Sequence, residues 1–266
     1  MDLGFRGEVA DLYHRYRRGY PPAVIDSLVE SFGLTGDDTV VDLGCGTGQL
    51  ALPIARQVRA VVGLDPEPDM LLRARRAADE QGVANVSWMI GADTDTPTLG
   101  RLLGDGTVGA VTIGQALHWM DHDRLFHTLA PLVRPGGGVA VLANGTPLWQ
   151  QDTAWSRALR DVLEQWCGRK LTRTCGTDEE SRRRYGTSLA AAGFEVHETG
   201  VDYTDELDLD RIVGSVYSAL PVDELPAPDR RPSFAEQVRC ALEPYAPFTE
   251  HVRVATLIGR THAATS

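Results

Sequence analysis

Hydrophobic and polar positions follow two alternating periods along the first half of the chain. Short apolar runs bounded by polar or glycine residues predict five strands, at 39–43, 60–64, 86–90, 109–113 and 139–143. Apolar residues at helical spacing predict helices at 22–32, 49–57, 66–80 and 124–133. Regular alternation of strand and helix indicates a parallel sheet covered by helices on both faces.

The second half of the chain has a less regular pattern. It predicts helices at 153–166, 178–192, 209–220 and 233–242, and strands at 194–203 and 251–258. Residues 221–232 carry four prolines and are expected to form an exposed connection. Residues 150–192 look like an insertion between the fifth and sixth strands, and no boundary divides the chain into two independent domains.

Length and composition indicate an ordinary globular protein. The chain has 266 residues, 42% of them hydrophobic, which suffices for one large domain or a domain with a small cap. It contains no run of 18 apolar residues, and residues 1–8 lack a signal-peptide core, so no membrane span and a cytoplasmic location are expected. The four cysteines are scattered, which favours reduced thiols and no metal site. The net charge of −11 disfavours a nucleic-acid partner.

The segment Val40–Gln49, with the sequence VVDLGCGTGQ, carries the strongest chemical signal. A strand ends in Asp42, and the glycines that follow allow backbone N–H groups to approach a ligand closely. The spacing differs from the G-x-G-x-x-G of dinucleotide sites, because the third position after Gly46 is Gln49. Asp42 would repel a pyrophosphate but suits a cationic ligand or an amino group. The alternative is a tight strand-to-helix turn without a ligand.

Residues 13–145 resemble the type-11 group of class I S-adenosylmethionine (SAM)-dependent methyltransferases. The resemblance rests on Tyr13, Tyr16-Arg17, Tyr20-Pro21, the glycine loop, Gly63–Asp65, Met70-Leu71 and the segments 91–97, 115–121 and 132–137. It implies an α/β, doubly wound, Rossmann-like sheet of seven mostly parallel strands, the last antiparallel, with a helical substrate cover. The expected layout is one domain over 1–266, with an N-terminal lid and first helix (1–35), a SAM-binding core (36–145), an inserted cover (146–192) and C-terminal strands and cover (193–266).

The resemblance implies a set of cofactor-binding residues: Tyr16, Arg17, Asp42, Gly44, Cys45, Gly46, Gln49, Asp65, Pro66, Met70, Ala92, Asp93 and Gln115. Asp65 can accept hydrogen bonds from both ribose hydroxyls, or cap the helix that follows it, and the two roles are compatible. Asp42 is expected to act through the loop and on the methionine amino group. Many relatives place an acid directly after the glycine near adenine; here that position is Ala92, so the role of Asp93 stays open.

The segment 115–121, QALHWMD, follows the fourth strand at the sheet edge where ligands bind. His118 can accept a proton from a hydroxyl or ammonium, and Trp119 can hold a substrate through its indole N–H or ring face. Alternatively, His118 packs on the methionine moiety and Trp119 fills the core. The segment resembles the L-H-W run of relatives that methylate carboxylates, where no base is needed.

The aromatic and basic run 13–20 is expected to fold over the cofactor, as it does in the family. It supplies Tyr13 as a substrate contact and His14 as an alternative base; the alternative is an amphipathic helix with a solvated basic side. Trp119, Trp149 and Tyr217 are further candidates for substrate binding, and the arginines at 182–184 are expected on a solvated helix face.

These features together predict methyl transfer from SAM to an oxygen, hydroxyl or carboxyl, of a small molecule, with S-adenosylhomocysteine (SAH) as product. The expected substrate is a secondary metabolite. The alternatives are an N- or C-methyltransferase of a small molecule, and a binding protein or cyclase that uses the SAM fold without methyl transfer. The net charge weighs against an RNA or protein substrate. A monomer or homodimer without a nucleic-acid or membrane partner is expected.

Overall fold

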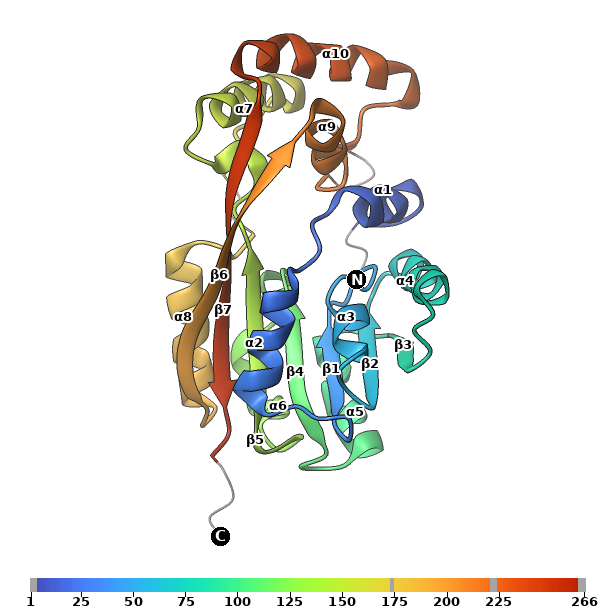
Figure 1. The fold of residues 1–266 in the computed structure, drawn as a ribbon, viewed down its shortest axis with the longest axis vertical. Helices are drawn as coiled ribbons and strands as arrows, with labels where there is room; N and C mark the ends of the chain where they lie inside the picture. The colour runs from blue at the N-terminus through green and yellow to red at the C-terminus, as the bar shows by residue number, and fades with distance from the viewer. Residues whose placement is uncertain (1–3, 173–174, 221–223, 263–266) are drawn as a thin grey trace.

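The computed structural model describes residues 4–172, 175–220 and 224–262. Its centre is a seven-stranded sheet in the order β3-β2-β1-β4-β5-β7-β6. The strands are β1 Thr39–Leu43, β2 Ala60–Asp65, β3 Val86–Ile90, β4 Val108–Gly114, β5 Val133–Asn144, β6 Glu195–Leu207 and β7 Phe248–Arg260. Strands β1 to β5 run parallel, and β7 runs antiparallel to both of its neighbours (Figure 1). The predicted doubly wound sheet is therefore confirmed.

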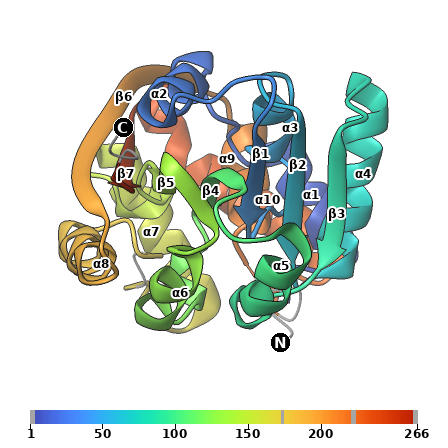
Figure 2. The same cartoon turned by 90° about the horizontal axis from the view of Figure 1, so that it is seen from below.

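Helices cover both faces of this sheet (Figure 2). One face carries α2 Pro22–Phe32, α3 Ala51–Ala55 and α4 Pro68–Gln81, and the other carries α5 Thr96–Leu103, α6 His122–Leu129 and α8 Glu179–Ala191. Consecutive residues of β1 face opposite sides: Val40 packs in the α2–α3 core and Val41 in the α6–α8 core. Burial on both faces explains why these strands appear in the sequence as continuous apolar runs.

A helical cap lies beyond the carboxyl ends of the parallel strands (Figure 1). It consists of α1 Glu8–Tyr16, α7 Ala154–Cys167, α9 Leu209–Tyr217 and α10 Arg231–Leu242. The cap has its own core, in which Leu159, Ile212 and Phe234 are fully buried. The long antiparallel pair β6–β7 extends into it, because Leu207 and Phe248 belong to the same core.

Several elements differ from the sequence-based expectation. The helix expected at 124–133 ends at Leu129, and Val133 already pairs with Val108, so β5 begins six residues before the expected 139. Helix α5 was not predicted, because its eight residues include Gly100 and few apolar positions. Strands β6 and β7 exceed the expected 194–203 and 251–258. Helices α7 and α8 lie between β5 and β6, within the stretch 150–192 that the sequence predicts as an insertion.

The proline-rich segment 221–232 lies partly outside the described residues. Of the remainder, Pro228–Arg230 forms a short 3-10 turn, and Arg231 already begins α10, two residues before the expected 233.

Candidate cofactor and active site

A cavity of about 430 Å³ lies between the carboxyl ends of the parallel strands and the helical cap. Its volume is within the range of small-molecule sites. The residues that line it include nearly all those selected from the sequence: Tyr13, Tyr16, Arg17, Asp42, Gly44, Cys45, Gly46, Gln49, Asp65, Pro66, Met70, Ala92, Asp93, Gln115, His118, Trp119 and Trp149. The fold therefore brings together residues that lie far apart in the chain.

The glycine loop after β1 is tied to the end of β2. The N–H groups of Gly44 and Cys45 both donate to the carbonyl oxygen of Leu64, at 2.8 and 3.0 Å. Gly44 and Gly46 have φ angles of 68° and 54°, in the left-handed region that favours glycine. A Cβ atom on Gly44 would also clash with Cβ of Ala116. The glycines thus allow the loop to turn sharply beside the cavity.

Asp42 is a buried carboxyl at the end of β1, with 1% of its surface exposed. Its Oδ1 accepts a hydrogen bond of 2.8 Å from Thr112 Oγ1, whereas Oδ2 has no hydrogen-bond partner among the described residues. Burial raises the pKa of Asp42 to about 7, and the nearby Asp65 carboxyl adds to the rise. A buried acceptor of this kind suits a ligand that brings an amino group.

Asp65, at the end of β2, accepts two backbone hydrogen bonds. Gly46 N–H donates to Oδ2 at 2.8 Å and Glu67 N–H donates to Oδ1 at 3.0 Å. The bond from Glu67 realises the capping role that the sequence allowed, although α4 begins at Pro68. Burial raises the pKa of Asp65 to about 6, against the effect of these two bonds. Each oxygen keeps a second lone pair, so contact with a ribose stays compatible with the observed bonds.

His118 and Trp119 lie on a short 3-10 turn, Leu117–Trp119, directly after β4. Their ring centroids are 5.0 Å apart, and both side chains line the cavity. Gln115 precedes the turn with a φ of 58°, a strained conformation for a residue other than glycine. Strained backbone conformations persist only where the surrounding structure enforces them, and they are concentrated at functional sites. The turn is thus a rigid support for both rings.

Asp93 holds this turn against the loop after β3. Its Oδ2 accepts a hydrogen bond of 3.1 Å from the N–H of Asp121, at the end of the His118 segment. Ala92 and Asp93 therefore lie at the cavity beside the turn, in the place where the resemblance puts adenine.

Helix α1 bridges the glycine loop and the cap. A Cβ atom on Gly46 would lie 3.6 Å from Cε1 of Tyr13, so the Tyr13 ring faces the loop directly. The Arg17 guanidinium lies 5.2 Å from the centre of the Tyr13 ring. On the cap side, the Tyr16 ring packs against Gly214 of α9, and its hydroxyl donates to Asp210 Oδ2 at 3.3 Å. This arrangement agrees with a lid over the cavity.

Comparison with known proteins identifies the core of this fold. Residues 40–137, from β1 to the start of β5, match a family model described as a methyltransferase domain. The chain carries a methyltransferase domain over these residues. The family model is a general one, so the narrower type-11 group stays a prediction.

Relatives of this methyltransferase domain occur among curated and solved proteins. An uncharacterised methyltransferase of Mycobacterium tuberculosis is 34% identical over 163 residues, which are 61% of this chain and 60% of the relative. The chain thus matches about three fifths of the length of that relative. A putative type II methyltransferase from Anaeromyxobacter dehalogenans shares the fold with a TM-score of 0.60 and 19% identity, over 93% of this chain and 98% of the other. The cyclase SpnF gives a TM-score of 0.52 at 20% identity, over 91% of this chain and 82% of its own.

Two candidate site residues, His14 and Tyr217, are not among the residues that line the cavity. Burial together with the charge of Arg73 on α4 lowers the pKa of His14. His14 follows Tyr13 by one residue, about 100° around the helix, so its side chain points in a different direction from the Tyr13 ring. Tyr217 is 8% exposed in the cap core, where its hydroxyl donates to the carbonyl oxygen of Arg231 at 3.4 Å.

Most aromatic residues considered for the cavity wall pack in hydrophobic cores instead. Trp155 and Phe248 contact each other edge to face in the cap, as do Trp166 and Phe234, and Phe194 packs under the sheet. Of the tryptophans outside the His118 turn, Trp149 is the one that lines the cavity.

Sequence reasoning missed several residues that line the cavity, among them Arg18, Tyr20, Glu67, Asn144, Arg169, Cys175 and Glu224. Tyr20 belonged to the Tyr20-Pro21 motif, and Asn144 ends a parallel strand, so both carried a recognisable signal. The lining residues contributed by the cap carried no recognisable signal, because they belong to no sequence motif.

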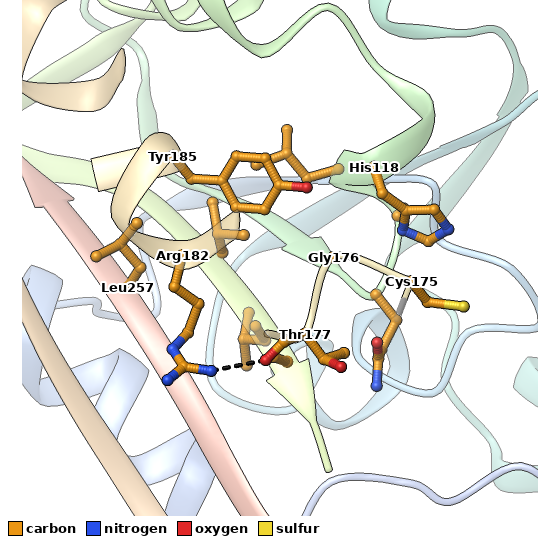
Figure 3. A pocket seen from close by; sticks show the side chains of 13 residues that line it. His118, Cys175, Gly176, Thr177, Arg182, Tyr185 and Leu257 are labelled. Atoms are coloured by element: carbon orange, nitrogen blue, oxygen red, sulfur yellow. Dashed lines mark hydrogen bonds between the residues drawn. The ribbon is translucent and has the colours of Figure 1, made fainter. Parts of the chain in front are cut away.

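A second cavity, of about 20 Å³, adjoins His118 (Figure 3). Arg182 and Tyr185 of α8 border it, together with the segment Cys175–Thr177 that precedes the helix. Arg182 Nη1 donates to the carbonyl oxygen of Thr177 at 2.6 Å, and a Cβ atom on Gly176 would lie 2.6 Å from the Tyr185 hydroxyl. Arg183 and Arg184 are exposed as expected, but Arg182 is half-buried and fixes this segment beside His118.

The described part of the chain has neither a cluster of metal-binding side chains nor a helix that could span a membrane. Residues 4–172, 175–220 and 224–262 contain no group of three or more His, Cys, Asp and Glu side chains that could hold a metal ion. Over the same ranges, no helix has the length and apolar character needed to cross a bilayer.

Proposed function

We propose that this protein is a SAM-dependent methyltransferase that acts on an oxygen, hydroxyl or carboxyl, of a small molecule. The observation that carries the proposal is the shared cavity. The buried carboxyls Asp42 and Asp65 line the same space as the His118–Trp119 turn and the helical cap. The groups suited to bind the cofactor and those suited to bind the methyl-accepting substrate thus line one cavity.

The residues around the glycine loop fit SAM. Asp42 Oδ2 and Gln49 Nε2 are buried polar atoms without a protein partner among the described residues, and such atoms are costly unless a ligand pairs with them. The cofactor's amino group can donate to Asp42, and its carboxylate can accept from Gln49. Asp65 takes the ribose hydroxyls, Ala92 and Asp93 border adenine, and Tyr16 and Arg17 close over the methionine end.

The enzyme's task in this reaction is alignment. When bound, SAM supplies an activated methyl group, whose bond to sulfur breaks with its electron pair left on sulfur as the acceptor oxygen bonds to carbon, giving SAH. Orientation by the rigid turn and the lid can lower the barrier by about 7–11 kcal/mol. Closure by α1 excludes water from the cavity. His118 accepts the proton of a hydroxyl substrate; a carboxylate brings no proton, and His118 then only positions it.

The cap side of the cavity supports a medium-sized, partly apolar acceptor. Leu148, Trp149 and Leu171 lie between β5 and β6, and Ala219 and Leu220 follow α9. Apolar walls with a few polar groups are typical of sites for such molecules. We therefore propose a secondary metabolite as the substrate. We also propose that the protein consists of one domain and acts in the cytoplasm as a monomer or homodimer.

The runner-up functions use the same cavity. Transfer to nitrogen or carbon needs the same cofactor position, and the sequence distance from characterised enzymes leaves the acceptor atom open. A binding protein or cyclase without methyl transfer is the other alternative, because SpnF shares the fold and fold alone does not determine function.

Methyl transfer can be tested without knowledge of the substrate. The purified chain is incubated with SAM carrying a trideuterated methyl group and fractions of host metabolites, and products are analysed by mass spectrometry. We expect a labelled small molecule that a heat-inactivated sample does not produce, with the label on oxygen. A label on nitrogen or carbon would establish a runner-up. The absence of any labelled product, with SAM binding intact, would favour the non-transferring alternative.

A further inference from the structure

A buried ion pair lies at the wall of the cavity, away from the glycine loop. Arg18, in the connection between α1 and α2, lines the cavity and donates from Nη2 to Glu250 Oε1 at 2.7 Å. The side chain of Glu250 on β7 is fully buried and also accepts a hydrogen bond from Gln151. Removing two charges from water is costly, so such a pair is weak evidence for a stabilising role. Its position at the cavity suggests a role in binding.

The chain is shaped to admit the Arg18 guanidinium. Gly145 directly follows β5 with a φ of 75°, and a Cβ atom there would lie 2.6 Å from Arg18 Nη1. The same Nη1 donates to the carbonyl oxygen of Asn144 at 3.3 Å. Arg18 is therefore held in one place by β5 and β7, with further N–H groups left to donate.

Asn144 supplies a hydrogen-bond acceptor beside this donor. Its Nδ2 donates to the carbonyl oxygen of Gly19 at 3.0 Å, which fixes the orientation of the amide. Its Oδ1 is buried and has no hydrogen-bond partner among the described residues. Asn144 is 7% exposed and lines the cavity. A ligand bound there can therefore donate the hydrogen bond that Oδ1 lacks.

The charges at this wall are balanced. Glu250 compensates Arg18, and a second pair that lines the cavity, Arg169 with Glu224, joins Nη2 to Oε2 at 2.6 Å. A carboxylate ligand would gain Arg18 but would meet the Asn144 oxygen and the Glu250 charge. An uncharged hydroxyl or primary carboxamide both accepts and donates hydrogen bonds, and matches both groups.

We propose that Arg18 and Asn144 form a recognition site for an uncharged hydroxyl or primary carboxamide group of the methyl-acceptor substrate. Arg18 donates to the group, Asn144 Oδ1 accepts from it, and Glu250 holds Arg18 in position. The site orients the substrate whichever of its atoms is methylated. This inference rests on the proposed function and narrows its substrate class.

Four two-ring probes test the site in the full chain loaded with SAH: 2-naphthol, 2-naphthamide, 2-naphthoate and 2-methoxynaphthalene. Their affinities are measured by ligand-observed NMR titration. We expect the naphthol and the naphthamide to bind about tenfold or more tighter than the methoxy compound, which lacks a donor, and than the carboxylate. Asn144→Ala should bring the naphthol and the methoxy compound to the same affinity.

Two double variants separate recognition from folding, because Asn144→Ala also removes the bond to Gly19. Arg18→Gln with Glu250→Gln replaces the ion pair by neutral amides and should lower the affinity of the naphthol and of the methoxy compound alike, because both accept a hydrogen bond from Arg18. Arg169→Gln with Glu224→Gln changes the matched pair on the same cavity and should leave both affinities unchanged. SAH affinity and thermal unfolding are measured for each variant to confirm an intact fold.

The inference fails if 2-naphthoate binds best, if the four probes bind equally, or if none binds while SAH does. It also fails if the affinity of 2-naphthol is unchanged in the Arg18 and Glu250 double variant. A wild-type chain that does not bind SAH would instead contradict the proposed function, so the two failures are distinguishable.

Discussion

Thr112 Oγ1 on β4 donates a 2.8 Å hydrogen bond to Asp42 Oδ1 on the neighbouring strand β1. The two residues are direct partners in the parallel register of these strands. The bond satisfies one oxygen of a fully buried carboxyl, and the other oxygen has no hydrogen-bond partner within residues 4–172, 175–220 and 224–262. A carboxyl group can thus be buried at the end of a core strand because Thr112 donates a hydrogen bond to one oxygen. We propose that the cofactor's amino group donates to the other.

The first prediction concerns the pH dependence of stability without cofactor. Burial raises the pKa of Asp42 to about 7, so the folded chain keeps a proton that the unfolded chain loses near pH 4. The free energy of unfolding should therefore fall as pH rises from about 4 to 7, by up to about 1.4 kcal/mol per pH unit for this proton. Asp42→Asn should remove this slope between about pH 6 and 7, as measured by urea unfolding.

Asp65 provides an internal reference for that measurement. Burial raises the pKa of Asp65 to about 6, so the free energy of unfolding should also fall with pH because of this group, but only up to about pH 6. Asp42→Asn should leave the contribution of Asp65, below about pH 6, unchanged. An unchanged slope above pH 6 in Asp42→Asn would show that Asp42 is ionised in the folded free protein.

The second prediction concerns the glycine loop. Gly46→Val should lower SAH affinity at least tenfold, about 1.4 kcal/mol, because a branched side chain would occupy the space beneath Tyr13. A Cβ there meets its nearest neighbour at 3.6 Å, so the cost to the fold is the strain of a valine at a φ of 54°, about 1–3 kcal/mol, and the chain should still fold. Gly44→Ala is the contrasting variant, in which the clash with Ala116 should lower the unfolding temperature itself. Wild-type affinity in a folded Gly46→Val chain would place the cofactor elsewhere.

The third prediction concerns Asp65. Asp65→Ala removes the acceptor of the Gly46 and Glu67 N–H groups and the proposed ribose contact. We expect SAM affinity to fall by roughly 1–3 kcal/mol in calorimetric titrations. Asp65→Asn, which keeps one acceptor oxygen, should lose less. If Asp65→Ala binds SAM as the wild type does, Asp65 only caps the turn before α4.

The fourth prediction uses His118 to distinguish the acceptors. For a hydroxyl substrate, His118→Ala should lower the rate about 10²–10⁴-fold and remove the acid limb of the pH–rate profile. For a carboxylate, the same change should raise KM and leave the profile flat near neutrality. His14→Ala, outside the cavity, is the matched control and should leave the rate unchanged. An unaltered rate in His118→Ala would remove His118 from the site.

The sheet and the glycine loop were predictable from the sequence for a physical reason. Strands buried on both faces, such as β1 with Val40 and Val41 in opposite cores, must be continuous apolar runs. The carboxyl ends of parallel strands meet at one edge, so Asp42, Asp65 and His118 were expected together, and they line one cavity.

The cap was not predictable in the same way. Tyr13 and His14 are neighbours in one helix, and the sequence alone did not reveal which of them faces the cavity. Tyr217 packs in the cap core because α9 is covered by α10, a contact that no periodicity shows. Arg18 and Glu250 are 232 residues apart, and their pairing follows only from the folded chain.

Calorimetric titration of the full chain with SAM and with SAH tests the central claim most directly. We predict that each binds at one site per chain with a Kd below about 1 mM, corresponding to more than about 4 kcal/mol of binding free energy. Gly46→Val should weaken both ligands, and ATP, which shares the adenosine but brings phosphates toward Asp42, should not bind there. The absence of binding by both SAM and SAH to a folded chain would contradict the account.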